Sequence, residues 1–302
     1  VRHAIAAGMA VLIVWWVWSP RSFTGEGQVR VTFLDVGQGD SAVIELPEGE
    51  VVLIDGGATY ERFDMGRGVV APFLWNRGIR AIDHVIATHP QLDHAGGLAW
   101  ILAHFRVENF WTNGVTRSED FWRKVERALS QRKLQSKVAE QGRRMVESGE
   151  CAMTVLNPPP GRDASSLGKQ QSLNNLSVVT ELLCGRRRIL FTGDIEREGL
   201  ARMVQSGHES PIDVLKVPHH GAASSLDRAW LSRVRPAIAV VSAGRRNPYG
   251  HPASEVIAAY QSVESKLWRT DQDGAVWAGL DLAQERLAMH STREWQLQPA
   301  FV

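Results

Sequence analysis

The segment THPQLDHAGG at residues 88–97 is the most informative part of this chain. It follows an apolar run at residues 85–87 that is typical of a strand, and it precedes a helical pattern at residues 98–102. A strand that leads directly into a helix brings His89, Asp93 and His94 to the carboxyl edge of a sheet. Neutral imidazoles and carboxylates are ligands of divalent cations, so the sequence predicts a metal site at this edge.

Four other short segments also place polar or glycine residues at the ends of predicted strands. Each is ordinary when taken alone, but together they indicate one shared site at a sheet edge. A dication held there can make a nucleophile from water at neutral pH. The segments are DVGQGDS at 35–41, IDGG at 54–57, LFTGD at 190–194 and KVPHHG at 216–221.

The composition is that of an ordinary globular protein. The 302 residues are 44% hydrophobic and 22% charged, enough for one large or two small domains. The net charge of +1 gives no global basic signal for nucleic acid. Cys151 and Cys184 lack the spacing of a metal knuckle. We expect each to be a small buried apolar side chain, with a disulfide between them as the alternative.

Residues 4–18 are apolar without interruption, and Pro20 closes the run. At about 15 to 17 residues the run is slightly shorter than a bilayer-crossing helix. We expect the end of a transmembrane helix at 1–20, a linker at 21–28 and one domain at 29–302. A signal sequence or a buried helix are the alternatives. Arg2 and His3 before the run favour a cytoplasmic start and an exported domain, whereas Arg21 after the run favours the opposite orientation.

Hydrophobic patterning predicts strands followed by helices in each half of the chain, and therefore two sheets packed face to face with helices outside. The first three strands are expected to form an antiparallel meander. The basic helix at 119–137 is either a solvated surface helix or a face for phosphate groups. Loops are expected at 142–149 and 158–169. Strands are expected at 29–36, 42–46, 51–54, 84–88, 176–183, 188–192, 214–217, 238–242, 267–270, 275–280 and 286–290, and helices at 69–77, 94–104, 119–137, 196–205, 225–234 and 253–262.

The order of these motifs resembles the metallo-β-lactamase superfamily. More narrowly, the chain resembles the C-terminal domain of the ComEC family, the DNA-internalisation channels of natural competence. The resemblance implies an α/β fold, a four-layer αββα sandwich, that follows a polytopic membrane region. It rests on FLDVGQGDS, LIDGG, THPQLDHAGGL, NNLSVV, LFTGD, LKVPHHG, NPYGHP and RTDQDGAV, which span roughly residues 29–276.

The resemblance also implies roles for individual residues. The second metal position of the superfamily would be ligated by Asp93, His94 and His219. Asp194 would bridge two metals, and His89 would belong to the first position. Supporting or weaker contacts would come from Asp55, which would orient an imidazole, and from His220.

Two departures from the superfamily pattern weaken the first position. Gln91 stands where a histidine is expected, and Asn174 and Asn175 occupy the stretch where another histidine ligand would lie. Amide oxygens are hard, neutral ligands that suit Mn²⁺ or Mg²⁺ better than Zn²⁺. We therefore expect one firmly bound divalent ion and a labile second one, with Mn²⁺ favoured and Zn²⁺ or Mg²⁺ as alternatives.

The loop at 245–252 adds a histidine and two guanidiniums near the same edge. Arginine matches phosphate oxygens bidentately, so Arg245, Arg246 and Asn247 are expected to bind a substrate phosphate. His251 would act in catalysis together with Asp93 and Asp194. A surface turn with scattered charge is the alternative for this loop.

The leading functional prediction is a metal-dependent DNA phosphodiesterase that degrades the strand not imported during transformation. A catalytically weak DNA-binding or gating module is one alternative, and a small-molecule metallo-hydrolase such as a lactonase or β-lactamase is another. The expected partners are single-stranded or duplex DNA, the membrane with the channel region, and other competence proteins. The parent protein is expected in the inner membrane, with this domain on the exported face.

Overall fold

The structure is a computed structural model that describes residues 27–161, 173–208 and 210–293. The expected membrane helix at 1–20 lies outside the described residues, as does most of the linker at 21–28. Among the residues that are described, every helix is too short or too polar to cross a lipid bilayer.

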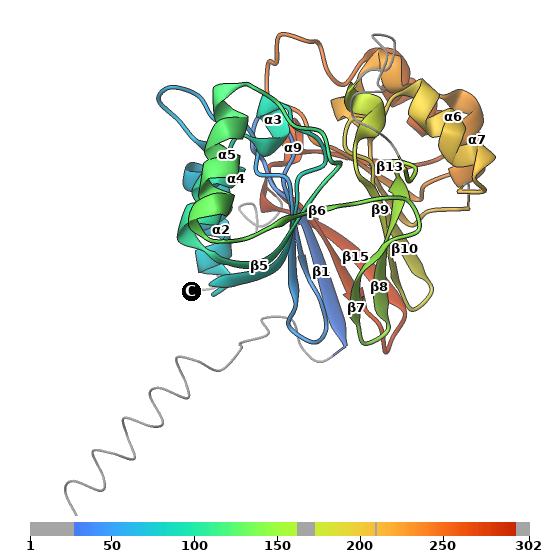
Figure 1. The fold of residues 1–302 in the computed structure, drawn as a ribbon. Coiled ribbons are helices and arrows are strands. Elements are labelled where there is room, and N and C mark those ends of the chain that lie inside the picture. Colours follow the sequence, from blue (N-terminus) through green and yellow to red (C-terminus); the bar gives the residue numbers. More distant parts are fainter. Residues whose placement is uncertain (1–26, 162–172, 209, 294–302) are drawn as a thin grey trace, which may run out of the picture.

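The described strands form two sheets that lie face to face (Figure 1). The first has eight strands in the order β15-β14-β1-β2-β3-β4-β5-β6, and the second has seven in the order β13-β12-β11-β10-β9-β8-β7. The bounds are β1 Gln28–Phe33, β2 Ala42–Glu45, β3 Val51–Ile54, β4 Ala81–Ile86, β5 Arg106–Thr112, β6 Ser136–Val138, β7 Arg144–Ser148, β8 Cys151–Asn157, β9 Val179–Cys184, β10 Arg187–Phe191, β11 Val214–Lys216, β12 Ile238–Val241, β13 Lys266–Arg269, β14 Val276–Asp281 and β15 Arg286–Ser291.

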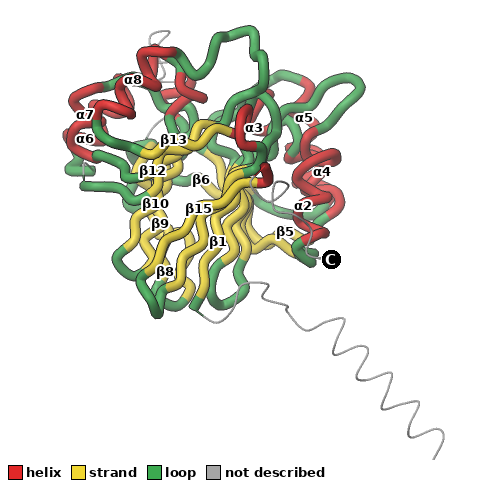
Figure 2. Tube along the Cα trace, turned by 180° about the vertical axis from the view of Figure 1, so that it is seen from behind, coloured by secondary structure: helices red, strands yellow, loops and turns green. Residues whose placement is uncertain are grey.

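Helices cover the outer faces of both sheets, as Figures 1 and 2 show from opposite sides. Alternate strand residues such as Val31, Ile44 and Leu182 point between the sheets and form the central core. The expected αββα sandwich is confirmed. The helices are α2 Ala71–Asn76, α3 Leu92–Ala95, α4 Leu98–His104 and α5 Asp120–Gln131 on the first sheet, α6 Arg197–Gln205, α7 Arg228–Val234 and α8 Ser254–Ser262 on the second, and the short α9 Thr270–Asp273.

Strand direction explains why polar residues meet at one edge. The strands β1, β2 and β3 form the expected antiparallel meander. The strands β3, β4, β5 and β6 are parallel, and so are β10, β11, β12 and β13. Parallel neighbours end at the same edge of a sheet. The segments after β3, β4, β10 and β11 therefore lie beside one another.

The structure differs from the sequence prediction in the middle of the chain. The loop expected at 142–149 contains strand β7, which pairs with β8 in a hairpin with an irregular register. Strands β5 and β8 were not predicted. The helix expected at 119–137 ends at Gln131, and β6 follows it. Burial does not alternate along the whole length of these short strands, so their periodic signal is weak. Pairing with distant partners stabilises them.

The two cysteines form a disulfide between neighbouring strands. Cys151 on β8 faces Cys184 on β9 in the strand register, and the two sulfur atoms are bonded. The expectation of two unpaired thiols is therefore wrong, and the alternative, a disulfide between them, is correct. A separation of 33 residues gives no local sequence signal for pairing.

Helix α5 has the character of a surface helix. Trp122 and Val125 are buried against the first sheet, whereas Arg123 and Lys124 are exposed. Lys124 forms an ion pair of 2.8 Å with Asp120 one turn earlier. One face of α5 is apolar and buried, and the other is charged and exposed, so solvent exposure is enough to explain the charged residues.

Candidate metal centre

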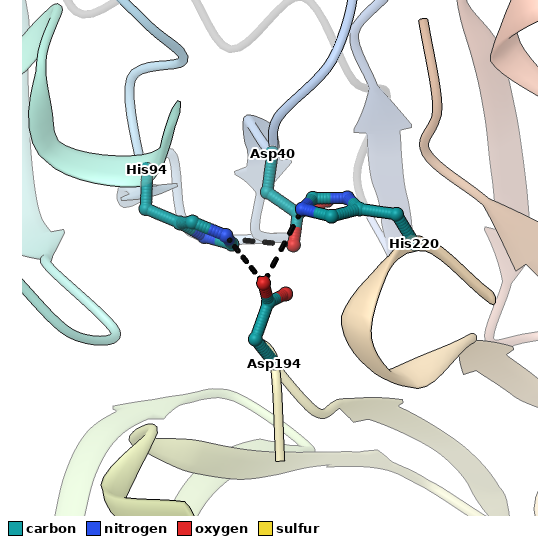
Figure 3. A group of neighbouring side chains, drawn as sticks. All are labelled: Asp40, His94, Asp194 and His220. Atoms are coloured by element: carbon teal, nitrogen blue, oxygen red, sulfur yellow. Dashed lines mark ion pairs between the residues drawn. The ribbon is translucent and has the colours of Figure 1, made fainter. Parts of the chain in front are cut away.

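The polar strand ends gather at one edge of the sandwich, between the two sheets (Figure 3). Asp40 follows the turn after β1, and His94 lies in α3 after β4. Asp194 follows β10, and His220 follows β11. All four are buried, and each offers one potential ligand atom within 4.8 Å of the others.

Asp55 holds the ring of His94 in place. The carboxylate lies 2.8 Å from Nδ1 of His94, and it also accepts hydrogen bonds from the Thr88 amide at 2.8 Å and the Thr88 hydroxyl at 2.7 Å. Both side chains are completely buried. A ring that donates from Nδ1 presents the lone pair of Nε2 to the site, which is the arrangement that metal-binding histidines need.

His220 is held in an equivalent way by a backbone group. Its Nδ1 lies 2.9 Å from the carbonyl oxygen of Ser242. His219 and His220 both have left-handed backbone conformations, with φ of 48° and 54°. Such conformations are rare outside glycine and concentrate at functional sites. They turn His220 inward, while the His219 side chain stays 22% exposed.

Asp194 Oδ2 and the Nε2 atoms of His94 and His220 are close enough to share one bound ion, and Asp93 Oδ2 lies beside the two rings. Asp194 Oδ2 lies 3.1 Å from His94 Nε2 and 3.3 Å from His220 Nε2. Asp93 Oδ2 lies 4.0 Å from His94 Nε2 and 3.5 Å from His220 Nε2. Ligands at 2.0–2.2 Å from a tetrahedral ion are about 3.3–3.6 Å apart. The donor set therefore fits a divalent cation.

Several buried polar atoms of this group lack hydrogen-bond partners among the described residues, which also indicates a site for a cation. Within the described part of the chain, no hydrogen-bond partner is found for His94 Nε2, His220 Nε2, His89 Nε2 or either carboxylate oxygen of Asp194, although all are buried. Buried polar atoms are nearly always satisfied in folded proteins. A cation is the group that would satisfy imidazole lone pairs and carboxylate oxygens together.

Asp40 belongs to this group but lies on its other side. Its carboxylate approaches Nδ1 of His94 at 3.7 Å and Nδ1 of His220 at 3.5 Å. These nitrogens already contact Asp55 and Ser242. Asp40 also forms an ion pair with the ammonium group of Lys216. Asp93 is therefore better placed than Asp40 to complete the ligand set on the Nε2 side.

The charges of the site shift its pKa values strongly. Burial alone would lower the pKa of His94, but Asp194 and Asp55 raise it well above its ordinary value. The pKa of His220 is likewise raised well above its ordinary value. Burial alone would lower it, but Asp194 and Asp40 raise it. Burial would raise the pKa of Asp194, but His220, His94 and Lys216 lower it well below its usual range. In the absence of an ion, protons on the two rings offset the carboxylate charge.

The region of the first metal position has fewer donors. Burial and the neighbouring His94 lower the pKa of His89 to about 3, so its ring is neutral. Gln91 donates a hydrogen bond of 2.7 Å to Asn174. Asn175 accepts hydrogen bonds from the Gly199 amide at 2.9 Å and the Glu196 amide at 3.1 Å, at the start of α6. The structure thus brings His89 to the site, turns Gln91 toward Asn174, and uses Asn175 to cap a helix.

His219 contacts a carboxylate that the sequence analysis did not single out. Its Nδ1 lies 3.2 Å from Glu196, and its Nε2 lies 3.7 Å from Asp194. The hydrogen bond from His219 lowers the pKa of Glu196, against the opposing effect of burial. His219 therefore lies at the rim of the site.

The loop at 245–252 lies next to this rim. The ring centre of His251 is 5.7 Å from that of His219 and 6.5 Å from that of His220. Arg245 and Arg246 are exposed. The Asn247 side chain bonds to backbone groups of its own loop, including the His251 carbonyl oxygen at 2.6 Å. Asn247 thus shapes the loop, whereas the two arginine side chains are exposed to solvent.

Comparison with known proteins agrees with this geometry. Residues 34–139 match the metallo-beta-lactamase superfamily. The protein has a metallo-β-lactamase fold. A solved metallo hydrolase, Igni18 from Ignicoccus hospitalis, superimposes with a TM-score of 0.51 at 15% identity and covers 83% of this chain and 98% of its own. That likeness concerns the fold alone.

Two curated relatives are similar over most of the chain. ComE operon protein 3 of Bacillus subtilis is 29% identical over 90% of this chain and 35% of its own length. Competence protein ComA of Neisseria gonorrhoeae is 26% identical over 91% of this chain and 36% of its own length. The resemblance to ComEC-like competence proteins is thereby confirmed. The chain spans about a third of the length of these relatives.

The sequence analysis assigned no site role to three residues that the structure brings to this cluster, Asp40, Glu196 and Lys216. In the sequence, Asp40 stands in a glycine-rich segment that is typical of a tight turn, and Glu196 stands at the start of a predicted helix. Neither position indicates a role in the site. Lys216 stands in a buried apolar strand, VLKV, where alternation predicts an apolar side chain. A lone charge at such a position is the signal that could have identified Lys216.

Proposed function

We propose that this chain is a metal-dependent phosphodiesterase that acts in DNA uptake and degrades the strand that is not imported. The observation that carries the proposal is the cluster of buried imidazole and carboxylate atoms, for which the described residues supply no hydrogen-bond partner. The superfamily match supports metal-dependent hydrolysis. The similarity to a relative named as a competence protein supports a role in DNA uptake.

In this proposal His94, Asp93, Asp194 and His220 hold one dication, with His220 in the role that the sequence assigned to His219. Mn²⁺ is favoured, with Zn²⁺ and Mg²⁺ as alternatives. A dication at such a site lowers the pKa of water and offsets charge on a phosphate. The carboxylates of Asp93 and Asp194 would orient the attacking water.

A second ion would be held weakly. His89 and Asp194 are the strong donors on that side, and the amides of Gln91 and Asn174 already bond to each other. Occupying this position would break that hydrogen bond. One firmly bound and one labile ion is therefore the expected stoichiometry.

The substrate phosphate would lie toward the rim. Arg245 and Arg246 are exposed on the loop that carries His251, and guanidinium groups match phosphate oxygens in charge and geometry. His251, whose Nδ1 is buried and lacks a hydrogen-bond partner within the described residues, has its ring centre 6.5 Å from that of His220. We assign to it a contact with the scissile phosphodiester.

The disulfide supports the proposed location. Disulfides persist in oxidising compartments and are rare in the cytosol, so the Cys151–Cys184 bond favours the exported face of the inner membrane. The parent protein would be anchored by the segment at 1–20 and a channel region, with other competence proteins as partners.

A nuclease assay tests the proposal. The chain is incubated with labelled single-stranded and duplex DNA in the presence of Mn²⁺, Mg²⁺, Zn²⁺ or EDTA. We expect cleavage with Mn²⁺ that EDTA abolishes. Asp194→Asn should be inactive, and Asp120→Asn, an exposed change on α5, should be fully active. DNA that stays intact with every metal would rule out the enzyme.

One observation favours a second candidate, a DNA-binding or gating module of the same channel. The structure engages Asn175 in capping α6 and Gln91 with Asn174, which leaves the first metal position poor in ligands. A module of this kind would bind DNA with an affinity that falls steeply with salt. It would show this binding in the nuclease assay without turnover.

A further inference from the structure

Lys216 is a buried charge at a position where the fold calls for an apolar side chain. It lies on β11 in the middle of the second sheet, and only 4% of it is exposed. Val214, two residues earlier on the same strand face, packs in the core between the sheets. Lysine is almost never fully buried unless it is paired, so its partners explain its presence.

The partners of Lys216 are the carboxylates of the metal centre. Its ammonium group forms an ion pair with Asp40 and lies 3.5 Å from Asp194 Oδ1. It also donates a hydrogen bond of 2.9 Å to the carbonyl oxygen of Gly193, the residue before Asp194. The ammonium therefore fixes both the backbone and one carboxylate oxygen of the Asp194 segment.

The other oxygen of Asp194 faces the imidazoles. Asp194 Oδ2 is the atom that lies 3.1 Å from His94 Nε2 and 3.3 Å from His220 Nε2. The two oxygens of one carboxylate thus point to two different cation positions. One position already holds the Lys216 ammonium, and the other is the proposed ion site.

We propose that Lys216 is a built-in cation of the metal centre, which binds Asp40 and one oxygen of Asp194 so that the centre holds a single dication firmly. The inference rests on the metal centre of the proposed function. It makes Lys216 a positioning residue that sets both the orientation of Asp194 and the net charge that an incoming ion meets.

A charge cycle at positions 40 and 216 tests this role. The affinity for Mn²⁺ is measured by calorimetric titration in the native chain, Lys216→Met, Asp40→Asn and the double variant. Removing the ammonium leaves an extra negative charge, so Lys216→Met should bind Mn²⁺ at least tenfold more tightly. Asp40→Asn leaves an extra positive charge and should bind it at least tenfold more weakly. The double variant should return to near the native affinity.

Electron paramagnetic resonance of the same samples counts the bound Mn²⁺ ions. One isolated ion is expected in the native chain, and a second, coupled ion is expected when Lys216→Met frees the oxygens of Asp40 and Asp194. If Lys216→Met does not fold, Asp40→Asn and the double variant still decide, because only a charge effect is reversed by the second change.

A lysine that merely links the sheets would lower stability without this pattern of affinities. Equal Mn²⁺ affinities in all folded variants, or a double variant as weak as Asp40→Asn, would overturn the inference. No DNA enters the titration. A native chain that fails to cleave DNA would therefore remove the phosphodiesterase proposal and leave the charge cycle intact.

Discussion

The carboxylate of Asp55 and the ring of His94 are joined at 2.8 Å inside a completely buried environment. Asp55 itself has a left-handed backbone, with φ of 58°. Positive φ is uncommon outside glycine, and at Asp55 it coincides with the contact that fixes the orientation of His94.

Replacing Asp55 by Asn should weaken metal binding without removing a ligand. An amide cannot match the charge that holds His94 Nδ1–H, and loss of such a partner typically costs 10–100-fold in metal affinity. Calorimetric titration with Mn²⁺ measures the change. Asp120→Asn on the exposed face of α5 is the control and should bind as the native chain does. Native affinity in Asp55→Asn would show that the contact has no role in metal binding.

Metal binding should weaken as the pH falls. The pKa values of His94 and His220 are raised well above 6.5 by the carboxylates around them, after the opposing effect of burial. Both rings must lose their protons before Nε2 can bind an ion, so binding releases protons. Titrations between pH 6 and pH 9 should show Mn²⁺ affinity rising with pH. An affinity that is flat across this range would contradict the assignment of the two rings.

The raised pKa values of His94 and His220 should also make the stability of the metal-free protein depend on pH. A histidine with a raised pKa in the folded state stabilises the fold fully below its unfolded pKa of about 6.5, and this stabilisation is lost as the pH rises through the folded pKa. In EDTA, the unfolding temperature should therefore be higher at pH 6 than at pH 9. His220→Asn should flatten this dependence, whereas changing the exposed His104 to Asn should leave it unchanged.

Gly39 should be irreplaceable because of its contact with Asp93. Its φ is 140°, and a Cβ there would collide with the carbonyl oxygen of Asp93. Gly49 is a matched control, since its φ is also positive, at 91°, but a Cβ would meet no atom within 4 Å. We expect Gly49→Ala to lower the free energy of unfolding by about 1–2 kcal/mol. Gly39→Ala should lower it further and also weaken Mn²⁺ binding; equal effects of the two changes in urea unfolding would disprove the steric argument.

The disulfide should contribute to stability but not to metal affinity. Cys151 and Cys184 close a loop of 33 residues, and a crosslink over that length stabilises a fold by about 3–4 kcal/mol. Urea unfolding with and without dithiothreitol should show this difference, and Mn²⁺ affinity should not change. An unfolding midpoint that is insensitive to the reductant would mean that the bond does not form in the purified protein.

Local patterns in the sequence were sufficient to predict the elements that build the site. The strand, turn and helix around His89 and Asp93, the antiparallel meander and the two-layered sheet arrangement all follow from periodicity and from glycine and proline positions. Each of these signals depends on residues that are close together in the chain.

The remaining parts depend on contacts between distant segments. The pairing of Cys151 with Cys184, and of Lys216 with Asp40, joins residues far apart in sequence, so no local pattern predicts it. The resemblance assigned the ligand role to His219, whereas the structure turns the ring of His220 toward Asp194. Two successive left-handed residues break the alternation that would tell which ring points inward.

The ligand atoms of the metal centre are divided between the two halves of the sandwich. Asp93 and His94 follow a strand of the first sheet, and Asp194 and His220 follow strands of the second. A bound ion would therefore cross-link the two sheets at this edge, and its binding free energy would add to the free energy of unfolding. Removing the ion with a chelator should therefore weaken the contact between the two sheets at this edge first and expose the apolar interior to proteases. The supply of metal would then affect how long the folded domain survives.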